Sequence, residues 1–115
     1  RLLGWVGFSK IDRAHKKLTI DSYWLASKDE ALFVEMMVML MTFGFEVARA
    51  NTIRLPCLAA LPTQRARIES LGATLDGILR GDKLSKDGKA QDVAVYSIIR
   101  SEWPEKSRKL LALLQ

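Results

Sequence analysis

The chain has 115 residues, of which 49% are hydrophobic and 27% charged, with 18 lysines and arginines against 13 aspartates and glutamates. This balance excludes a disordered tail, a collagen and a disulfide scaffold, and a chain of this length is expected to fold around one core. The single cysteine, Cys57, cannot form an intramolecular disulfide, so we expect the cytoplasm or another reducing compartment.

The net charge of +5 does not by itself indicate a nucleic-acid-binding protein. The densest basic run, residues 13–17 (RAHKK), lies between two apolar segments and contains no aromatic residue that could stack on bases. A solvated turn is the favoured interpretation. His15 has no cysteine, aspartate or glutamate at ligand spacing beyond Asp12, so we expect no metal site.

The first half of the chain predicts two strands and a long helix. Residues 5–11 are mostly apolar, as in a strand covered on both faces, and residues 18–24 alternate as a second strand antiparallel to the first. Residues 28–48 hold the longest apolar segment, but Glu35, Gly44 and Glu46 interrupt it, and a membrane span needs about 20 mainly apolar residues. We therefore predict a core helix buried nearly all round, with its methionines as core filler and a methionine-lined partner groove as the alternative.

The second half predicts a strand, a helix, a hairpin and a last helix. Residues 51–58 form the strand, with Pro56 marking a disturbed ladder near its end. The helix opens at Pro62 and is stopped by Gly72, and residues 77–84 and 92–99 flank an Asp87-Gly88 turn. Residues 105–114 form a short amphipathic helix. The resulting order of elements predicts a mixed α/β sheet with helices on its faces.

Five blocks of the C-terminal half carry a resemblance to a known family: residues 68–73 (IESLGA), 76–80 (DGILR), 87–88 (DG), 92–99 (DVAVYSII) and 102–104 (EWP). In this order and spacing they resemble the Rim-type branch of the GNAT acetyltransferase superfamily, whose members transfer acetyl from acetyl-CoA to amines such as protein N-termini. Residues 4–11, the strand end at 23–26 and Glu35 are similar more loosely.

The resemblance implies a single GNAT-like domain over residues 1–115, with the acyl-CoA N-acyltransferase fold but without the family's first strand and first two helices. We therefore expect either a fragment or a chain whose sheet edge is completed by a partner in a homo- or hetero-oligomer. Apart from such a protein partner, the resemblance implies an amine substrate. We expect neither a membrane nor a nucleic acid as a partner.

The resemblance also implies where the cofactor lies. In the family, the strand that ends near residues 23–26 splays from its parallel neighbour near 53–58, and the pantetheine arm enters between them. The pyrophosphate lies on the loop that opens the main helix. The positions carried over to cofactor binding are Tyr23, Trp24, Leu25, Ala26, Lys28, Asp29, Glu30, Ala31, Leu32, Leu61 and Gln64.

The candidate acid for the leaving thiolate is a tyrosine, either Tyr23 or Tyr96, although packing is the favoured role for Tyr96 in the family's late strand. With one histidine and one cysteine in turn-like and strand-like contexts, no Cys/His or Ser/His/Asp arrangement is expected. A covalent acyl-enzyme is therefore not predicted.

Two departures from the family pattern leave two functions open. Asp29 and Glu30 place carboxylates where phosphates should lie, and the Ser27-x-x-Glu30 pattern predicts a capping box that satisfies the helix N–H groups internally. Leu61 stands where the family carries an asparagine, and Gln64 where it carries a serine. One hypothesis is an acetyl-CoA-dependent N-acetyltransferase, favoured by the resemblance. The other is a catalytically degenerate module that serves as a structural or interaction subunit of a larger assembly, favoured by the departures.

Overall fold

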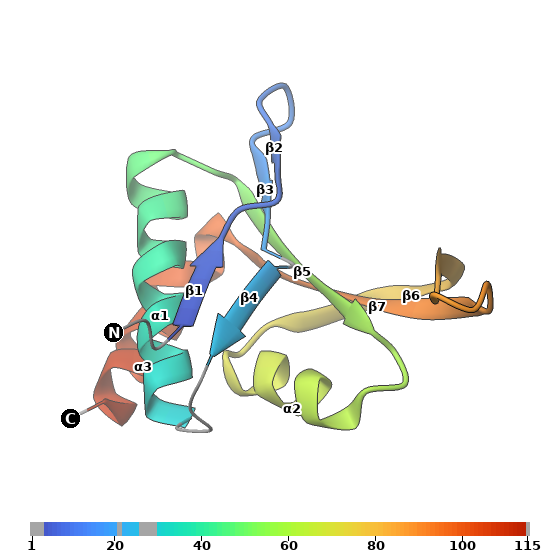
Figure 1. Ribbon diagram of the computed structural model, residues 1–115. Coiled ribbons are helices and arrows are strands. Elements are labelled where there is room, and N and C mark those ends of the chain that lie inside the picture. Colours follow the sequence, from blue (N-terminus) through green and yellow to red (C-terminus); the bar gives the residue numbers. More distant parts are fainter. Residues whose placement is uncertain (1–3, 21, 26–29, 115) are drawn as a thin grey trace.

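The computed structural model describes residues 4–20, 22–25 and 30–114 (Figure 1). In chain order the elements are β1 (Gly4–Gly7), β2 (Lys10–Asp12), β3 (Lys17–Thr19), β4 (Ser22–Leu25), α1 (Glu30–Thr42), the π-helical η1 (Phe43–Val47), β5 (Thr52–Leu58), α2 (Pro62–Ser70), β6 (Thr74–Leu84), β7 (Ala90–Ile99), the 3-10 turn η2 (Arg100–Glu102) and α3 (Trp103–Leu113). The predicted mixed α/β order is confirmed. The first two predicted strands are each divided in two, as β1 with β2 and as β3 with β4.

The strands form a five-stranded mixed sheet in the order β2-β3-β5-β7-β6 and a separate two-stranded ladder of β1 with β4. β3 and β5 are parallel, with Leu18 opposite Ile53, and α1 lies between them in the chain. The other pairs are antiparallel. The predicted adjacency of the second and third strands is confirmed over β3, whereas β4 pairs elsewhere.

The core lies on one face of the five-stranded sheet. Register places Ile53 opposite Ile98 and Leu55 opposite Tyr96, and all four side chains are at most 1% exposed. Side chains of all three α-helices complete the cluster, among them Phe33, Met37, Ile68 and Leu110. At the far end of α1, the ring of Phe45 stacks on that of Trp103 at 5.4 Å, which joins η1 to α3.

Helix α1 buries one face only. Phe33, Met37 and Met41 are fully buried, but Met39 is 68% exposed. The prediction of a helix buried nearly all round is therefore wrong: residues four apart share a face, whereas Met39 lies about half a turn from its buried neighbours. Met37 and Met41 fill the core as predicted. Among the described residues, no helix has both the length and the apolar character needed to cross a bilayer.

The C-terminal hairpin forms around the predicted turn. Gly88 has a φ of +85°, and the Ser85 N–H donates to the Lys89 carbonyl at 2.9 Å. Gly72, also at φ +85°, follows the end of α2 and donates to the Glu69 carbonyl, as expected for a glycine that stops a helix. The hairpin strands are longer than predicted, and α3 begins at Trp103 because a proline is tolerated in the first helical turn.

Candidate functional site

Two parallel strands separate part-way along the sheet. β3 pairs with β5 from Lys17 to Thr19, and the Ile20 N–H donates to the Arg54 carbonyl at 2.9 Å. Beyond this point β4 pairs with β1, while β5 continues to Leu58 beside β7 (Figure 1). The structure therefore contains the divergence that the resemblance implies.

The second half of β5 presents backbone groups to the side that β4 has left. Asn51 and Ala59 hydrogen-bond to the β7 side, through the Arg100 N–H and the Asp92 carbonyl. Successive residues of a strand direct their N–H and C=O groups to opposite sides. The backbone groups of Pro56 and Leu58 therefore face away from β7, toward the gap between β4 and β5. The disturbed ladder predicted at Pro56 is wrong, because register with β7 is regular through Leu58. Proline fits because the N–H that it lacks would point to an edge without a strand.

The beginning of α1 is joined to α2 by an ion pair. The Arg67 Nε donates to Glu30 Oε1 at 3.1 Å, and the Arg67 guanidinium lies 5.3 Å from the centroid of the Phe33 ring. Ser27, with which Glu30 was expected to form a capping box, lies outside the described residues, as do the candidates Ala26, Lys28 and Asp29. The carboxylate of Glu30 binds α2 through Arg67, a residue 37 positions away that sequence spacing could not identify.

The other described candidates lie around this region. Tyr23, Trp24 and Leu25 are on β4, and Ala31 and Leu32 are in the first turn of α1. Leu61 precedes α2 without a side-chain cap. With Gln64, it lines a hollow of about 210 Å³ beside Pro56, Cys57 and Leu58 at the end of β5.

A second hollow, of about 400 Å³, lies between the start of α1 and α2, where Glu30, Thr63 and Arg67 line it. We call the two hollows together the α2 cleft. The structure thus places Leu61 and Gln64 on one side of α2 and Glu30 on the other, near the divergence of β4 from β5.

Tyr96 does not reach the α2 cleft. Its ring is 1% exposed, and its hydroxyl donates to Glu69 Oε2 at 2.6 Å and accepts from Arg65 Nε at 3.0 Å. Burial raises the pKa of the phenol, and the hydrogen bond to Glu69 raises it further. Its burial and these two hydrogen bonds favour the packing role of Tyr96 over that of a thiolate acid. Tyr96 anchors α2 to the sheet.

Arg65 and Arg67, two cations of α2, both have protein partners. Arg65 also donates from Nη1 to the Ala59 carbonyl at 3.4 Å. Cys57 is partly buried, and burial raises the pKa of its thiol, which disfavours a nucleophilic thiolate. Over the described ranges, no three histidine, cysteine, aspartate or glutamate side chains gather as a metal site.

Comparison with known proteins agrees with this geometry. No family model matches the sequence. A Bacillus subtilis (strain 168) protein named "Putative ribosomal N-acetyltransferase YdaF" is 27% identical over 104 residues, which cover 89% of this chain and 56% of that protein. A GCN5-related N-acetyltransferase from Brucella melitensis superposes with a TM-score of 0.91 at 25% identity, over 98% of this chain and 52% of its own. The chain has the fold of the GNAT acetyltransferases and is similar in sequence to members of that superfamily.

A third protein extends this similarity. The crystal structure of a T. thermophilus protein described as a "putative acetyltransferase" superposes with a TM-score of 0.89 at 28% identity, over 98% of this chain and 61% of its own. The chain thus spans between about half and three fifths of each relative. GNAT acetyltransferases use acetyl-CoA as acyl donor, and the names of these relatives give no support to a catalytically degenerate module.

Proposed function

We propose that this GNAT chain forms the cofactor-binding part of an acetyl-CoA-dependent N-acetyltransferase that acetylates an amine. The observation that carries the proposal is the divergence of β4 from β5 beside the start of α1. The Rim-type branch, with a protein N-terminus as acceptor, is the finer proposal. Its support is the five C-terminal sequence blocks and the similarity to the B. subtilis protein named as a ribosomal N-acetyltransferase.

The residues present fit the amide-rich arm of acetyl-CoA. The Pro56 carbonyl and the Leu58 N–H face the divergence, so an extended chain of amides can bind there as a strand would. Such binding uses backbone groups and tolerates the replacement of the family's asparagine by Leu61. When bound, acetyl-CoA supplies an acetyl group activated as a thioester, and the open strand edges orient it. Tyr23, on β4, remains the proposed acid for the thiolate.

The fit at the phosphate end is constrained by charge. Among the described residues that line the hollow beside the start of α1, Arg67 is the cation, and its side chain is 19% exposed. Its Nε already donates to Glu30, so a phosphate must displace a carboxylate or share the guanidinium with it. We therefore propose that Glu30 lowers the affinity for acetyl-CoA without abolishing it.

Calorimetric titration with acetyl-CoA tests this proposal. Glu30→Gln removes the carboxylate's charge beside Arg67, and we expect it to tighten binding about fivefold, the effect of about 1 kcal/mol for one partly exposed charge pair. Glu35→Gln is the matched control, because Glu35 is an exposed glutamate of the same helix that no described contact ties to α2. It should leave the affinity unchanged.

Two results would contradict the proposal. The absence of acetyl-CoA binding to the parent and to both variants would reject a cofactor site in this chain. Equal tightening in Glu30→Gln and Glu35→Gln would show that total charge, not the contact with Arg67, controls binding.

We also propose that a further strand, from a second copy or from another protein, pairs with the edge of the β1–β4 ladder. Among the described strands, β1 has only β4 as a partner, and an unpaired strand edge binds other chains readily. Sedimentation velocity measures the assembly. A purely monomeric chain whose β1 amides exchange rapidly would contradict this part of the proposal.

A further inference from the structure

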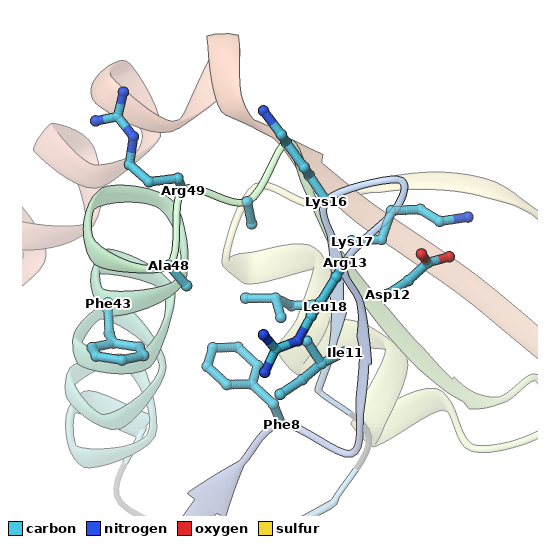
Figure 2. A pocket seen from close by; sticks show the side chains of 11 residues that line it. Phe8, Ile11, Asp12, Arg13, Lys16, Lys17, Leu18, Phe43, Ala48 and Arg49 are labelled. Atoms are coloured by element: carbon cyan, nitrogen blue, oxygen red, sulfur yellow. The ribbon is translucent and has the colours of Figure 1, made fainter.

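A second concave site lies at the opposite end of β5 from the α2 cleft. It is a pocket of about 420 Å³ between the β2–β3 turn and the segment that joins η1 to β5 (Figure 2). Because β5 has seven residues, the two sites are about 20 Å apart. This pocket is separate from the proposed cofactor site.

The floor of this pocket is apolar. Phe8, Leu18, Phe43 and Ala48 point toward one another across it (Figure 2). The rings of Phe8 and Phe43 are 6.5 Å apart and inclined by 33°, and Phe43 is 50% exposed. An exposed aromatic floor of this kind favours the binding of an aromatic or aliphatic group, because binding removes apolar surface from water.

The rim carries four cations and one carboxylate. The side chains of Arg13, Lys16 and Arg49 have no hydrogen-bond or ion-pair partner among the described residues. Lys17 acts electrostatically on Asp12, which binds His15 through both carboxylate oxygens. Figure 2 shows Arg13 extending toward Phe8 and Ile11, whereas the charged ends of Lys16 and Arg49 extend upward from the rim and Lys17 and Asp12 are directed to the other side. The side of the pocket near the aromatic floor therefore has unpaired positive charge and no facing carboxylate.

The backbone conformation is unusual at two of these residues. Lys16 and Arg49 have φ values of 53° and 62° and are the non-glycine residues with positive φ in the described ranges. The Lys16 carbonyl accepts from the Asn51 N–H at 2.7 Å and from the Thr52 N–H at 3.3 Å, which ties the turn to the beginning of β5. The Arg100 Nη1 donates to the carbonyls of Phe45 and Ala50 and fixes the opposite wall.

We propose that this pocket binds a small amphipathic anion, a phosphate or carboxylate group attached to an aromatic or aliphatic body. The body packs against Phe8 and Phe43, and the anionic group pairs with Arg13, while Lys16 and Arg49 add positive charge at the rim. The volume is within the usual range of about 300 to 1,000 Å³ for small-molecule sites. A nucleic acid is disfavoured, because the cations surround one pocket and form no stripe along which a strand could run.

Titration with benzyl phosphate, followed by backbone amide NMR and calorimetry, tests the proposal. Inorganic phosphate and benzyl alcohol each supply half of the ligand, so benzyl phosphate should bind at least tenfold more tightly than either. Amide shifts should centre on Lys16, Arg49 and Ala50. An excess of acetyl-CoA should not displace the ligand, which separates this test from that of the cofactor site.

The variant Lys16→Asn/Arg49→Asn removes two rim charges while keeping residues that tolerate positive φ. We expect it to weaken benzyl phosphate binding at least fivefold. Lys86→Gln/Lys89→Gln removes the same charge from the exposed β6–β7 turn and should leave the affinity unchanged. Arg13→Gln is a second variant, exposed and without a described partner, which should also weaken binding if the paired variant does not fold.

Three outcomes would overturn the proposal. Benzyl phosphate binding no tighter than inorganic phosphate would show that the aromatic floor takes no part. An equal loss in the β6–β7 control would show attraction by net charge alone. A short single-stranded oligonucleotide that binds when benzyl phosphate does not would assign the surface to nucleic acid.

Discussion

Replacing Tyr96 by phenylalanine removes one oxygen atom from beneath α2 and leaves the ring in place. That oxygen donates to Glu69 and accepts from Arg65, and each hydrogen bond to a charged group stabilises by about 1.5 to 3 kcal/mol. Glu69 is exposed and Arg65 half-buried, so both regain part of their hydration in the variant. We therefore expect Tyr96→Phe to lower the free energy of unfolding by about 2 kcal/mol, which is less than the sum of about 3 to 6 kcal/mol for two such bonds because of this regained hydration.

Urea unfolding followed by circular dichroism measures this loss. With an m value of about 2 kcal/mol per molar urea, the midpoint should fall by about 1 M at unchanged m. Glu69→Gln keeps an oxygen that can accept from the phenol, so it should lose less than Tyr96→Phe. The double variant should show a coupling of about 1 kcal/mol between the two positions. A midpoint within about 0.3 M of the parent in Tyr96→Phe would refute the role of this hydroxyl as the anchor of α2.

The same hydroxyl predicts a dependence on pH. Burial, and then the hydrogen bond to Glu69, raise the pKa of Tyr96 above its usual value near 10. The folded chain therefore holds the phenolic proton to higher pH than the unfolded chain. The resulting stability is fully present below about pH 10 and is lost as the pH rises through the folded-state pKa. Urea midpoints should fall more steeply above pH 10 in the parent than in Tyr96→Phe, and parallel curves would contradict the assignment.

Two glycines give further predictions. A Cβ at Gly44 would lie 2.8 Å from Ile53 Cδ1 and 3.1 Å from Leu18 Cδ1, both in buried side chains, so Gly44→Ala should destabilise by about 1 to 3 kcal/mol. Gly77→Ala is the control, because no atom lies within 4 Å of its Cβ position; an equal loss in thermal unfolding would show that crowding is not the cause. Gly88→Val forces a β-branched residue to a φ of +85° and should lose about 1 kcal/mol or more, and an unchanged thermal midpoint would mean that this conformation does not matter to the hairpin.

The sequence by itself determined the elements whose signals are local. Alternation in residues 92–99, the Asp-Gly pair at 87–88 and Gly72 after α2 all predicted structure that is present. These signals succeed because turn and helix-end conformations depend on residues within a few positions of one another. The apolar run in residues 32–41 was less informative, because composition without a clear period does not say which side chains of a helix face solvent.

The tertiary structure alone decided the contacts that give the two sites their character. Glu30 meets Arg67 across 37 residues, and Tyr96 binds Arg65 and Glu69 across 31 and 27. The basic turn at 13–17, which contains no aromatic residue, lies beside Phe43. This is because β3 and β5 pair in parallel, which brings the segment after α1 back to the beginning of β3. Pairing across a sheet is set by the burial of whole strands and helices together, so no local pattern contains it.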